Sequence, residues 1–169
     1  MKKKIAILGS TGSIGKSTID ILRKDKKNFD VVLLTTNNNY RKILKQAKEF
    51  KARNIIINNK KHYLTLKKKL RNNKINIFNN FQSFNNKFKS KIDFSMSAIS
   101  GLEGLKPTLD LIKFSKTIAI ANKESIICAW NLIQQRLNKY KTKFIPVDSE
   151  HFSIWSLLDG DKSNVEEVI

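Results

Sequence analysis

The chain has 169 residues, 40% of them hydrophobic, so it is long enough for one domain with a buried core and too short for a large multidomain assembly. Its 33 Lys and Arg against 14 Asp and Glu give a net charge of +19, a value typical of nucleic-acid-binding domains. However, 28 of the 33 cations are Lys, whereas specific base recognition favours Arg. The excess lies entirely in residues 1–92, with 24 basic and 4 acidic residues. We interpret it as a bias of composition and expect no nucleic-acid partner.

The cysteine content and the N-terminus indicate the compartment. A single cysteine, Cys128, excludes an internal disulfide and fits a reducing environment. The apolar run between Lys4 and Gly9 has only four residues, too few for a secretion signal or a membrane span. We therefore expect a cytoplasmic protein with no membrane partner. Because Cys128 follows Ile126 and Ile127 in a predicted helix, we expect its side chain to be buried.

Short apolar runs alternate with amphipathic segments along the chain. The predicted strands are residues 5–8, 31–34, 55–57, 75–78, 94–99, 117–121 and 144–147. The predicted helices are residues 14–22, 40–50, 63–70, 102–114 and 125–137, and residues 79–91, which show no clear period, are expected to form a loop or a short helix. This alternation predicts a doubly wound α/β fold with a mostly parallel sheet, whose strands all end at one edge.

A glycine-rich segment, Gly9–Gly15 (GSTGSIG), joins the first predicted strand to the first predicted helix. Glycines in this context permit a tight turn and let the main chain approach a pyrophosphate, while the N–H groups at the helix start attract anions. The spacing is G-x-x-G-x-x-G rather than the usual G-x-G-x-x-G. The segment predicts a Rossmann-like dinucleotide site, and a purely structural turn is the alternative.

The segment after the second predicted strand indicates which dinucleotide would bind. A site for NAD usually places Asp or Glu there to hold the ribose 2′-hydroxyl group. Residues 35–42 instead supply neutral donors and two cations, Arg41 and Lys42, and contain no carboxylate. A 2′-phosphate would meet no repulsion at such a position. We therefore expect NADPH rather than NADH, with the alternative that the Asn residues merely fill a loop.

Two further polar clusters follow predicted strands. The first, Asn122–Ser125 (NKES), is equally consistent with a ligand site and with a simple helix start. In the second, Pro146–His151 (PVDSEH), Asp148 and Glu150 would point to the same face if the segment stays extended. Two carboxylates there would suit Mg²⁺ or Mn²⁺. A helix cap by Asp148 or Ser149 is the alternative.

These three clusters, in this order and spacing, together resemble those of the 1-deoxy-D-xylulose 5-phosphate reductoisomerases, enzymes of non-mevalonate isoprenoid biosynthesis. The segments Ser100–Leu102 and Pro107–Leu109 between them also fit the pattern of that family. The resemblance covers essentially all 169 residues. It implies an NADPH-binding domain at residues 1–148 and, at residues 149–169, the beginning of an incomplete catalytic domain.

The resemblance also implies roles for individual residues. The cofactor NADPH would be bound by Thr11, Gly12, Ser13, Ile14, Asn37, Asn38, Asn39, Asn122 and Glu124. A sugar phosphate substrate would be bound by Lys123, Ser149 and Glu150, and the metal, Mg²⁺ or Mn²⁺, by Asp148 and Glu150. The catalytic residues would be Lys123, Asp148 and Glu150. The implied reaction is a metal-assisted rearrangement followed by hydride transfer, and the full-length family members are expected to form homodimers.

One departure from the family affects the cofactor preference. The family usually has Gly-Lys-Asn where this chain has Asn37, Asn38 and Asn39, so only Asn39 matches. The family also has a third metal-binding carboxylate, phosphate-binding residues and a mobile lid further along the chain, and this sequence does not contain them. We therefore expect the chain to bind nucleotide without turnover. The competing hypotheses are an inactive nucleotide-binding remnant or interaction module and, more remotely, a basic nucleic-acid binder.

Overall fold

The computed structural model describes residues 1–70 and 74–158, apart from the side chains of Glu150, His151 and Leu158. Its strands are β1 (Lys3–Leu8), β2 (Phe29–Thr36), β3 (Asn54–Ile57), β4 (Asn76–Phe78), β5 (Ile92–Ser97), β6 (Ser115–Ile120) and β7 (Lys143–Pro146). Its helices are α1 (Ser13–Lys24), α2 (Tyr40–Phe50), α3 (Lys60–Lys69), α4 (Phe81–Lys87), α5 (Leu105–Ile112), α6 (Lys123–Tyr140) and α7 (Ser149–Leu158), with a 3₁₀ turn η1 (Leu102–Gly104) before α5.

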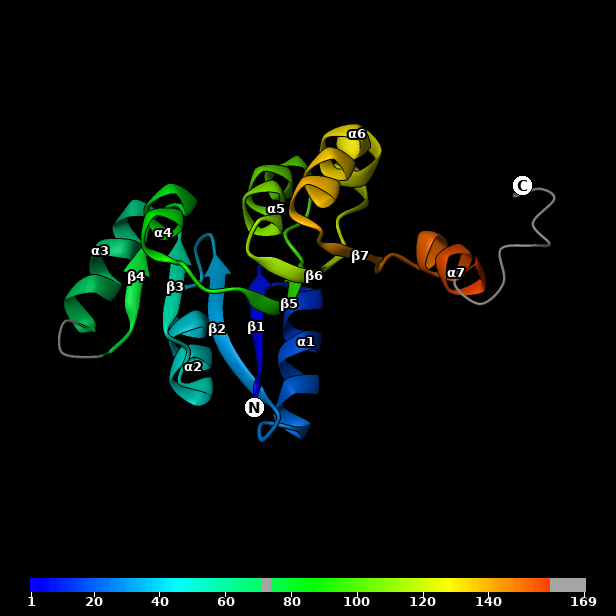
Figure 1. Ribbon diagram of the computed structural model, residues 1–169. Coiled ribbons are helices and arrows are strands. Elements are labelled where there is room, and N and C mark those ends of the chain that lie inside the picture. Colours follow the sequence, from blue (N-terminus) through cyan, green and yellow to red (C-terminus); the bar gives the residue numbers. More distant parts are fainter. Residues whose placement is uncertain (71–73, 159–169) are drawn as a thin grey trace.

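The strands form one sheet in the order β4-β3-β2-β1-β5-β6-β7, with every neighbouring pair parallel. The order runs from left to right in Figure 1, and α7 lies beyond β7. The chain builds outward from β1 to β4 and then returns to β5 on the other side of β1. The strand order therefore reverses between β1 and β5, and open α/β sheets bind ligands in the crevice at such a point.

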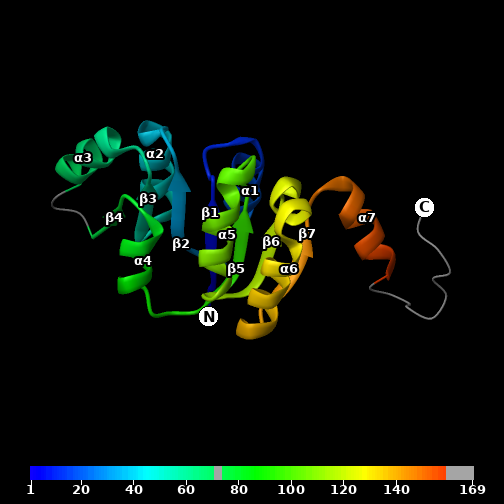
Figure 2. The ribbon, with the colours of Figure 1, turned by 90° about the horizontal axis from the view of Figure 1, so that it is seen from above.

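Helices cover both faces of the sheet. Apolar residues of α1, α2 and α3, such as Ile19, Ile43 and Leu66, pack on one face. Those of α4 and α5, such as Phe84 and Leu111, pack on the other, and α6 joins them over β6. Figure 2 shows α2 and α3 on the opposite side of the sheet from α4. The central strands are buried on both sides, which explains their continuous apolar sequences.

The predicted α/β fold and its parallel sheet are confirmed. All the predicted strands and helices are present, and the segment 79–91, which has no clear period, contains the short helix α4. The expectation that Cys128 is buried is wrong, because its side chain is exposed. Ile126 and Ile133 face inward, whereas Ile127 is 70% exposed and Ala129 departs from helical geometry with φ −142° and ψ 30°. The inward face of α6 therefore excludes residues 127 and 128.

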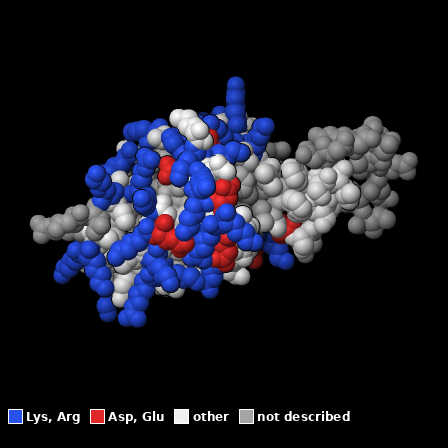
Figure 3. All heavy atoms as spheres, turned by 90° about the horizontal axis from the view of Figure 1, so that it is seen from below, with Lys and Arg blue, Asp and Glu red and all other residues white. Residues whose placement is uncertain are grey.

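Basic side chains cover much of the face seen in Figure 3. On the face seen in Figure 3, Lys and Arg surround a few carboxylates and do not gather in one stripe, and the end formed by α7 has few of them. A nucleic-acid-binding surface usually concentrates its cations on one face or along one helix.

Within the described ranges, no helix has both the length and the apolar character needed to cross a membrane.

Candidate functional site

The turn after β1 requires glycine at two positions. Gly9 has φ +72°, and a Cβ added to it would lie 2.5 Å from the carbonyl oxygen of Ala98, which follows β5. A Cβ added to Gly15 would collide with the carbonyl oxygen of Gly9. Gly9 therefore lets the turn approach the end of β5, and Gly15 lets the start of α1 pack against the turn. Any residue with a side chain would be too large at either position.

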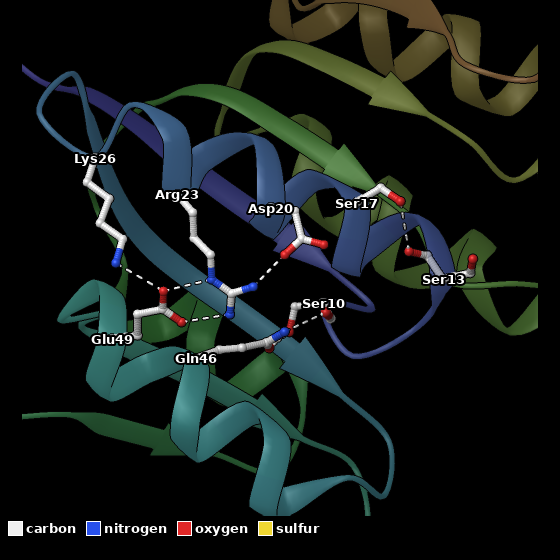
Figure 4. Close-up of polar contacts among 8 residues, drawn as sticks. All are labelled: Ser10, Ser13, Ser17, Asp20, Arg23, Lys26, Gln46 and Glu49. Atoms are coloured by element: carbon white, nitrogen blue, oxygen red, sulfur yellow. Dashed lines mark hydrogen bonds and ion pairs between the residues drawn. The ribbon is translucent and has the colours of Figure 1, made fainter.

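Hydrogen bonds from β2 and α2 fix this turn. Gly9 N donates to Thr35 Oγ1 at 2.9 Å, and Ser10 N donates to the Thr35 carbonyl oxygen at 3.0 Å. Gln46 Nε2 donates to the Ser10 carbonyl oxygen at 2.9 Å, while Ser10 Oγ donates to Gln46 Oε1 at 2.8 Å (Figure 4). Both side chains of the Ser10–Gln46 pair are buried. The turn is therefore held in place without a ligand.

The N-terminus of α1 differs from those of four other helices. Asn side chains accept a hydrogen bond from the first turns of α2, α3, α4 and α6, at Asn39, Asn59, Asn80 and Asn122. The corresponding residue of α1 is Gly12, which has no side chain to do so. The first N–H groups of a helix have no acceptor within the helix. Those of α1 are consequently available to an anion.

A cavity of about 310 Å³ lies beside this open helix start. It brings together Thr11 and Gly12 of the turn and Asn37, Asn38 and Asn39 of the segment after β2, five of the residues assigned to NADPH from the sequence. Ser13 and Ile14 lie outside its lining and are exposed on the first turn of α1. The cavity lies at the strand-order reversal, where open α/β sheets bind their ligands.

Five lining residues were missed by the sequence analysis. Asn58 follows β3, Phe81 begins α4, and Ala98, Ile99 and Glu103 follow β5. Asn58 and Ala98 stand directly after strands, so the rule that ligands bind at the carboxyl ends of strands could have identified them. No local pattern marks Phe81 or Glu103.

The Asn122–Ser125 cluster begins α6 at the same edge. Asn122 is 1% exposed, and its Nδ2 donates to the carbonyl oxygens of Ile99 and Gly101 while its Oδ1 accepts from Ser125 N at 2.8 Å. The side chain of Asn122 therefore fixes the loop after β5, which lines the cavity. Lys123 and Glu124 are exposed at the start of α6.

The third cluster follows β7. Phe152 N donates to the carbonyl oxygen of Asp148 at 2.9 Å, so a helix starts here. Of the two alternatives for this segment, the helix start is the one observed, and the extended arrangement that would place Asp148 and Glu150 on one face is not, because residues two apart on a helix do not share a face. Asp148 is half-buried, Ser149 is exposed, and the side chain of Glu150 lies outside the described residues. Among the described residues no group of three or more His, Cys, Asp or Glu side chains could hold a metal ion.

The register of the sheet relates the three clusters. Leu8 of β1 pairs with Ser97, Ser97 with Ile120, and Ile120 with Pro146. The residues that follow these four therefore lie along one edge. Since neighbouring strands are about 4.8 Å apart, the turn after β1 and the segment after β7 are roughly 14 Å from each other.

The family model of 1-deoxy-D-xylulose 5-phosphate reductoisomerase matches residues 5–130. The chain belongs to this family. The reductoisomerase of Pelagibacter ubique is 61% identical over 169 residues, which cover 99% of this chain and 44% of that relative. That of the Wolbachia of Brugia malayi is 38% identical over 168 residues, covering 99% and 43%. The chain spans less than half the length of the curated reductoisomerases that it matches.

Solved reductoisomerase structures have the same fold. The enzyme of Zymomonas mobilis in complex with NADPH is 34% identical, with a TM-score of 0.81 over 89% of this chain and 40% of that one. A reductoisomerase in complex with NADPH, fosmidomycin and magnesium is 29% identical, with a TM-score of 0.83 over 97% of this chain and 42% of that one. The resemblance seen in the sequence and the Rossmann-like fold are thus confirmed.

Proposed function

We propose that the chain is the cofactor-binding part of an NADPH- and divalent-metal-dependent reductoisomerase. The reaction would convert 1-deoxy-D-xylulose 5-phosphate to 2-C-methyl-D-erythritol 4-phosphate. The observation that carries this proposal is the open start of α1 beside a cavity of about 310 Å³ at the strand-order reversal. Family membership and the NADPH complex of the Zymomonas mobilis relative support it. These relatives give no support to a nucleic-acid binder or an inactive remnant.

The residues around the cavity fit NADPH. The main-chain N–H groups of Thr11, Ser13 and Ile14 would hold the diphosphate, because this helix start has a positive dipole end and no side-chain cap. Gly12, whose N–H donates to the Gly9 carbonyl oxygen at 3.0 Å, would let the main chain approach the diphosphate. The segment Asn37–Asn39 would face the adenosine ribose. Asn122 would act by fixing the loop after β5, since its polar atoms are engaged within the protein, and Glu124 would lie at the cofactor from the start of α6.

The second and third clusters would serve the substrate and the metal. The exposed ammonium of Lys123 and the hydroxyl of Ser149 would contact the sugar phosphate, together with Glu150. Asp148 and Glu150 offer hard oxygen ligands that suit Mg²⁺ or Mn²⁺. When bound, NADPH supplies the hydride and the metal supplies positive charge for a developing alkoxide. We propose Lys123, Asp148 and Glu150 as the catalytic residues.

Several further properties belong to the proposal. The domain boundary would fall at residues 148–149, where β7 has ended and α7 begins. The enzyme would be a cytoplasmic homodimer acting on a small sugar phosphate, without a nucleic-acid or membrane partner. The 169-residue chain would bind nucleotide without completing the reaction.

Nucleotide fluorescence and Mn²⁺ binding test these assignments on the chain itself. We expect saturable NADPH binding, and Asp148→Ala should weaken Mn²⁺ binding while leaving the NADPH dissociation constant within about threefold, a change below ~1 kcal/mol. Asp110→Ala, which removes a carboxylate from a surface pair with Lys106, is the matched control and should change neither. A larger loss of NADPH affinity in Asp148→Ala would contradict the metal role, and absence of NADPH binding would contradict the proposed function.

A further inference from the structure

A second hollow lies in the groove between α1 and α2. Its volume is about 210 Å³, and its charged and polar lining residues are Lys16, Asp20 and Arg23 from α1 and Lys42, Lys45 and Gln46 from α2. It shares none of its lining residues with the cavity at the glycine turn. Four cations and one carboxylate therefore surround a space large enough for a small anionic group.

The ion pairs of the groove gather at one end. Arg23 donates to both carboxylate oxygens of Glu49, at 2.7 and 2.8 Å, and also binds Asp20 (Figure 4). Lys26 donates to the same Glu49 at 3.0 Å. Arg23 contacts one oxygen of the Asp20 carboxylate, and the four cations of the lining outnumber this single carboxylate, so the groove keeps an excess of positive charge.

Three lysines account for that excess. Lys16, Lys42 and Lys45 have no carboxylate within 4.0 Å among the residues that the structure describes. The Lys16 ammonium lies beside that of Lys42 and, together with partial burial, lowers the pKa of Lys42. Two ammonium groups side by side repel each other, whereas a phosphate between them would attract both.

The groove lies next to the proposed nucleotide site. Lys16 follows Gly12 by four residues on α1, and Lys42 follows Asn39 by three on α2. At 1.5 Å per residue these separations correspond to roughly 6 Å and 4.5 Å along the two helix axes. The buried Ser10–Gln46 pair links the glycine turn to α2 at the groove. A group bound to both helices here would be adjacent to the segment Asn37–Asn39, which itself offers no cation.

We infer that Lys16 and Lys42 bind a phosphate monoester and that this group is the 2′-phosphate of NADPH. The inference rests on the proposed function, because it assumes that the nucleotide lies at the glycine turn. Cations near the end of the second strand hold a 2′-phosphate in NADPH-binding folds. In this chain Lys16 and Lys42, near the starts of α1 and α2, would supply these cations in place of the segment Asn37–Asn39. Free phosphate has the same chemistry and is the alternative source.

The test compares two double variants of the 169-residue chain. Lys16→Gln with Lys42→Gln removes the proposed pair, and Lys24→Gln with Lys48→Gln removes two exposed cations from the opposite ends of the same helices. Fluorescence titration at fixed ionic strength gives the dissociation constants of NADPH and NADH. We expect the unaltered chain to favour NADPH at least about tenfold, or about 1.4 kcal/mol. The first variant should lose that preference by weakening NADPH alone, and the control should keep it.

Each other outcome has a distinct meaning. Equal weakening of both nucleotides in the Lys16 and Lys42 variant, or an unchanged preference, would overturn the inference while leaving the nucleotide site intact. Absence of binding by either nucleotide to the unaltered chain would overturn the proposed function and the inference with it. Inorganic phosphate should compete with NADPH and not with NADH. If it perturbs the Lys16 and Lys42 resonances although the variant keeps its preference, free phosphate is the ligand and the 2′-phosphate assignment is wrong.

Discussion

The starts of α1 and α6 occupy equivalent places in the sheet and differ in their chemistry. Both helices follow buried parallel strands, β1 and β6, at the same edge. The residue before α6 is Asn122, whose side chain accepts from Ser125 N and donates to the loop after β5. The residue before α1 is Gly12, which offers no side chain. One helix start therefore stabilises the protein, and the other leaves its N–H groups to a ligand.

The residue before each helix, Asn122 or Gly12, thus decides whether the helix start is a structural site or a binding site on the same sheet edge. An Asn cap stabilises a helix by about 1 kcal/mol relative to Ala, while Gly at the same position is only a few tenths worse than Asn. The protein thus loses little stability by leaving α1 without a side-chain cap. It gains a group of main-chain donors held rigidly by the Ser10–Gln46 pair. Four substitutions or measurements can break or sharpen this comparison.

The largest effect is expected at Gly9. Gly9→Ala places a Cβ against the main chain at Ala98 at a positive φ, so both the conformation and the clash oppose folding. We expect a loss of about 3 kcal/mol in the free energy of unfolding, measured by urea denaturation.

Gly101→Ala is the matched control for Gly9→Ala. Gly101 has a similar φ of +70°, and an added Cβ would meet no atom within 4 Å. Only the conformational cost applies, about 2 kcal/mol, because φ +70° with ψ −177° is a backbone region that is almost restricted to glycine. Equal losses in the two variants would show that the close approach of the turn to β5 does not constrain the protein.

Asn122→Ala should give the next largest effect. It removes the cap of α6 and leaves the partly buried carbonyl oxygens of Ile99 and Gly101 without their donor. We expect a loss of about 2 kcal/mol in the free energy of unfolding. Asn80→Ala removes an exposed cap of α4 and should lose about 1 kcal/mol. The assigned structural role of Asn122 fails if the two losses agree.

Gly12→Asn converts the open helix start to the capped kind. Gly12 already has the extended φ and ψ of −74° and −178°, and an added Cβ would lie 3.3 Å from the Gly9 carbonyl oxygen. We expect stability to change by only a few tenths of a kcal/mol. NADPH affinity should fall about tenfold, because the new side chain would compete for the N–H groups that bind phosphate. Unchanged NADPH affinity with an intact fold would contradict the role of the open start.

The smallest effect concerns the far end of the α1–α2 groove. The Arg23 guanidinium and the Lys26 ammonium lower the pKa of Glu49 to about 2, below the value of about 4.3 expected in the unfolded chain. Its contribution is therefore complete above about pH 4.3 and is lost as the pH falls through about 2. Because Arg23 is 42% exposed, we expect Glu49→Gln to lose no more than about 1 kcal/mol at neutral pH.

The pH dependence of that loss is the check. Denaturation of the Glu49→Gln variant and of the unaltered chain, measured from pH 7 to pH 2, should give stabilities that converge at the acid end. A difference that grows as the pH falls would contradict the ion-pair assignment.

Much of the fold could be predicted from the sequence, because buried parallel strands have continuous apolar runs. The segment Ile55–Ile57, for example, lies entirely within β3, and the predicted helix 40–50 coincides with α2. The glycine turn was also identifiable, since its position between a strand and a helix is a local signal. Thr11, Gly12 and Asn37–Asn39 meet at one cavity because the parallel topology places their segments at one edge.

The remaining features depend on tertiary structure. Sequence spacing suggested a shared face for Asp148 and Glu150, but the chain begins α7 at Ser149 instead. The exposure of Cys128 depends on which side of α6 packs over β6, which its apolar neighbours do not reveal. Phe81 and Glu103 reach the cavity from elements that no short motif connects to it.

Amide NMR spectra of the chain during a titration with NADPH test the central claim most directly. If main-chain N–H groups at the open start of α1 hold the diphosphate, the amide resonances of residues 11–15 should shift with saturation, by more than those of residues 123–126 at the capped start of α6. Shifts confined to the start of α6, or absent from residues 11–15 while NADPH is bound, would contradict the account.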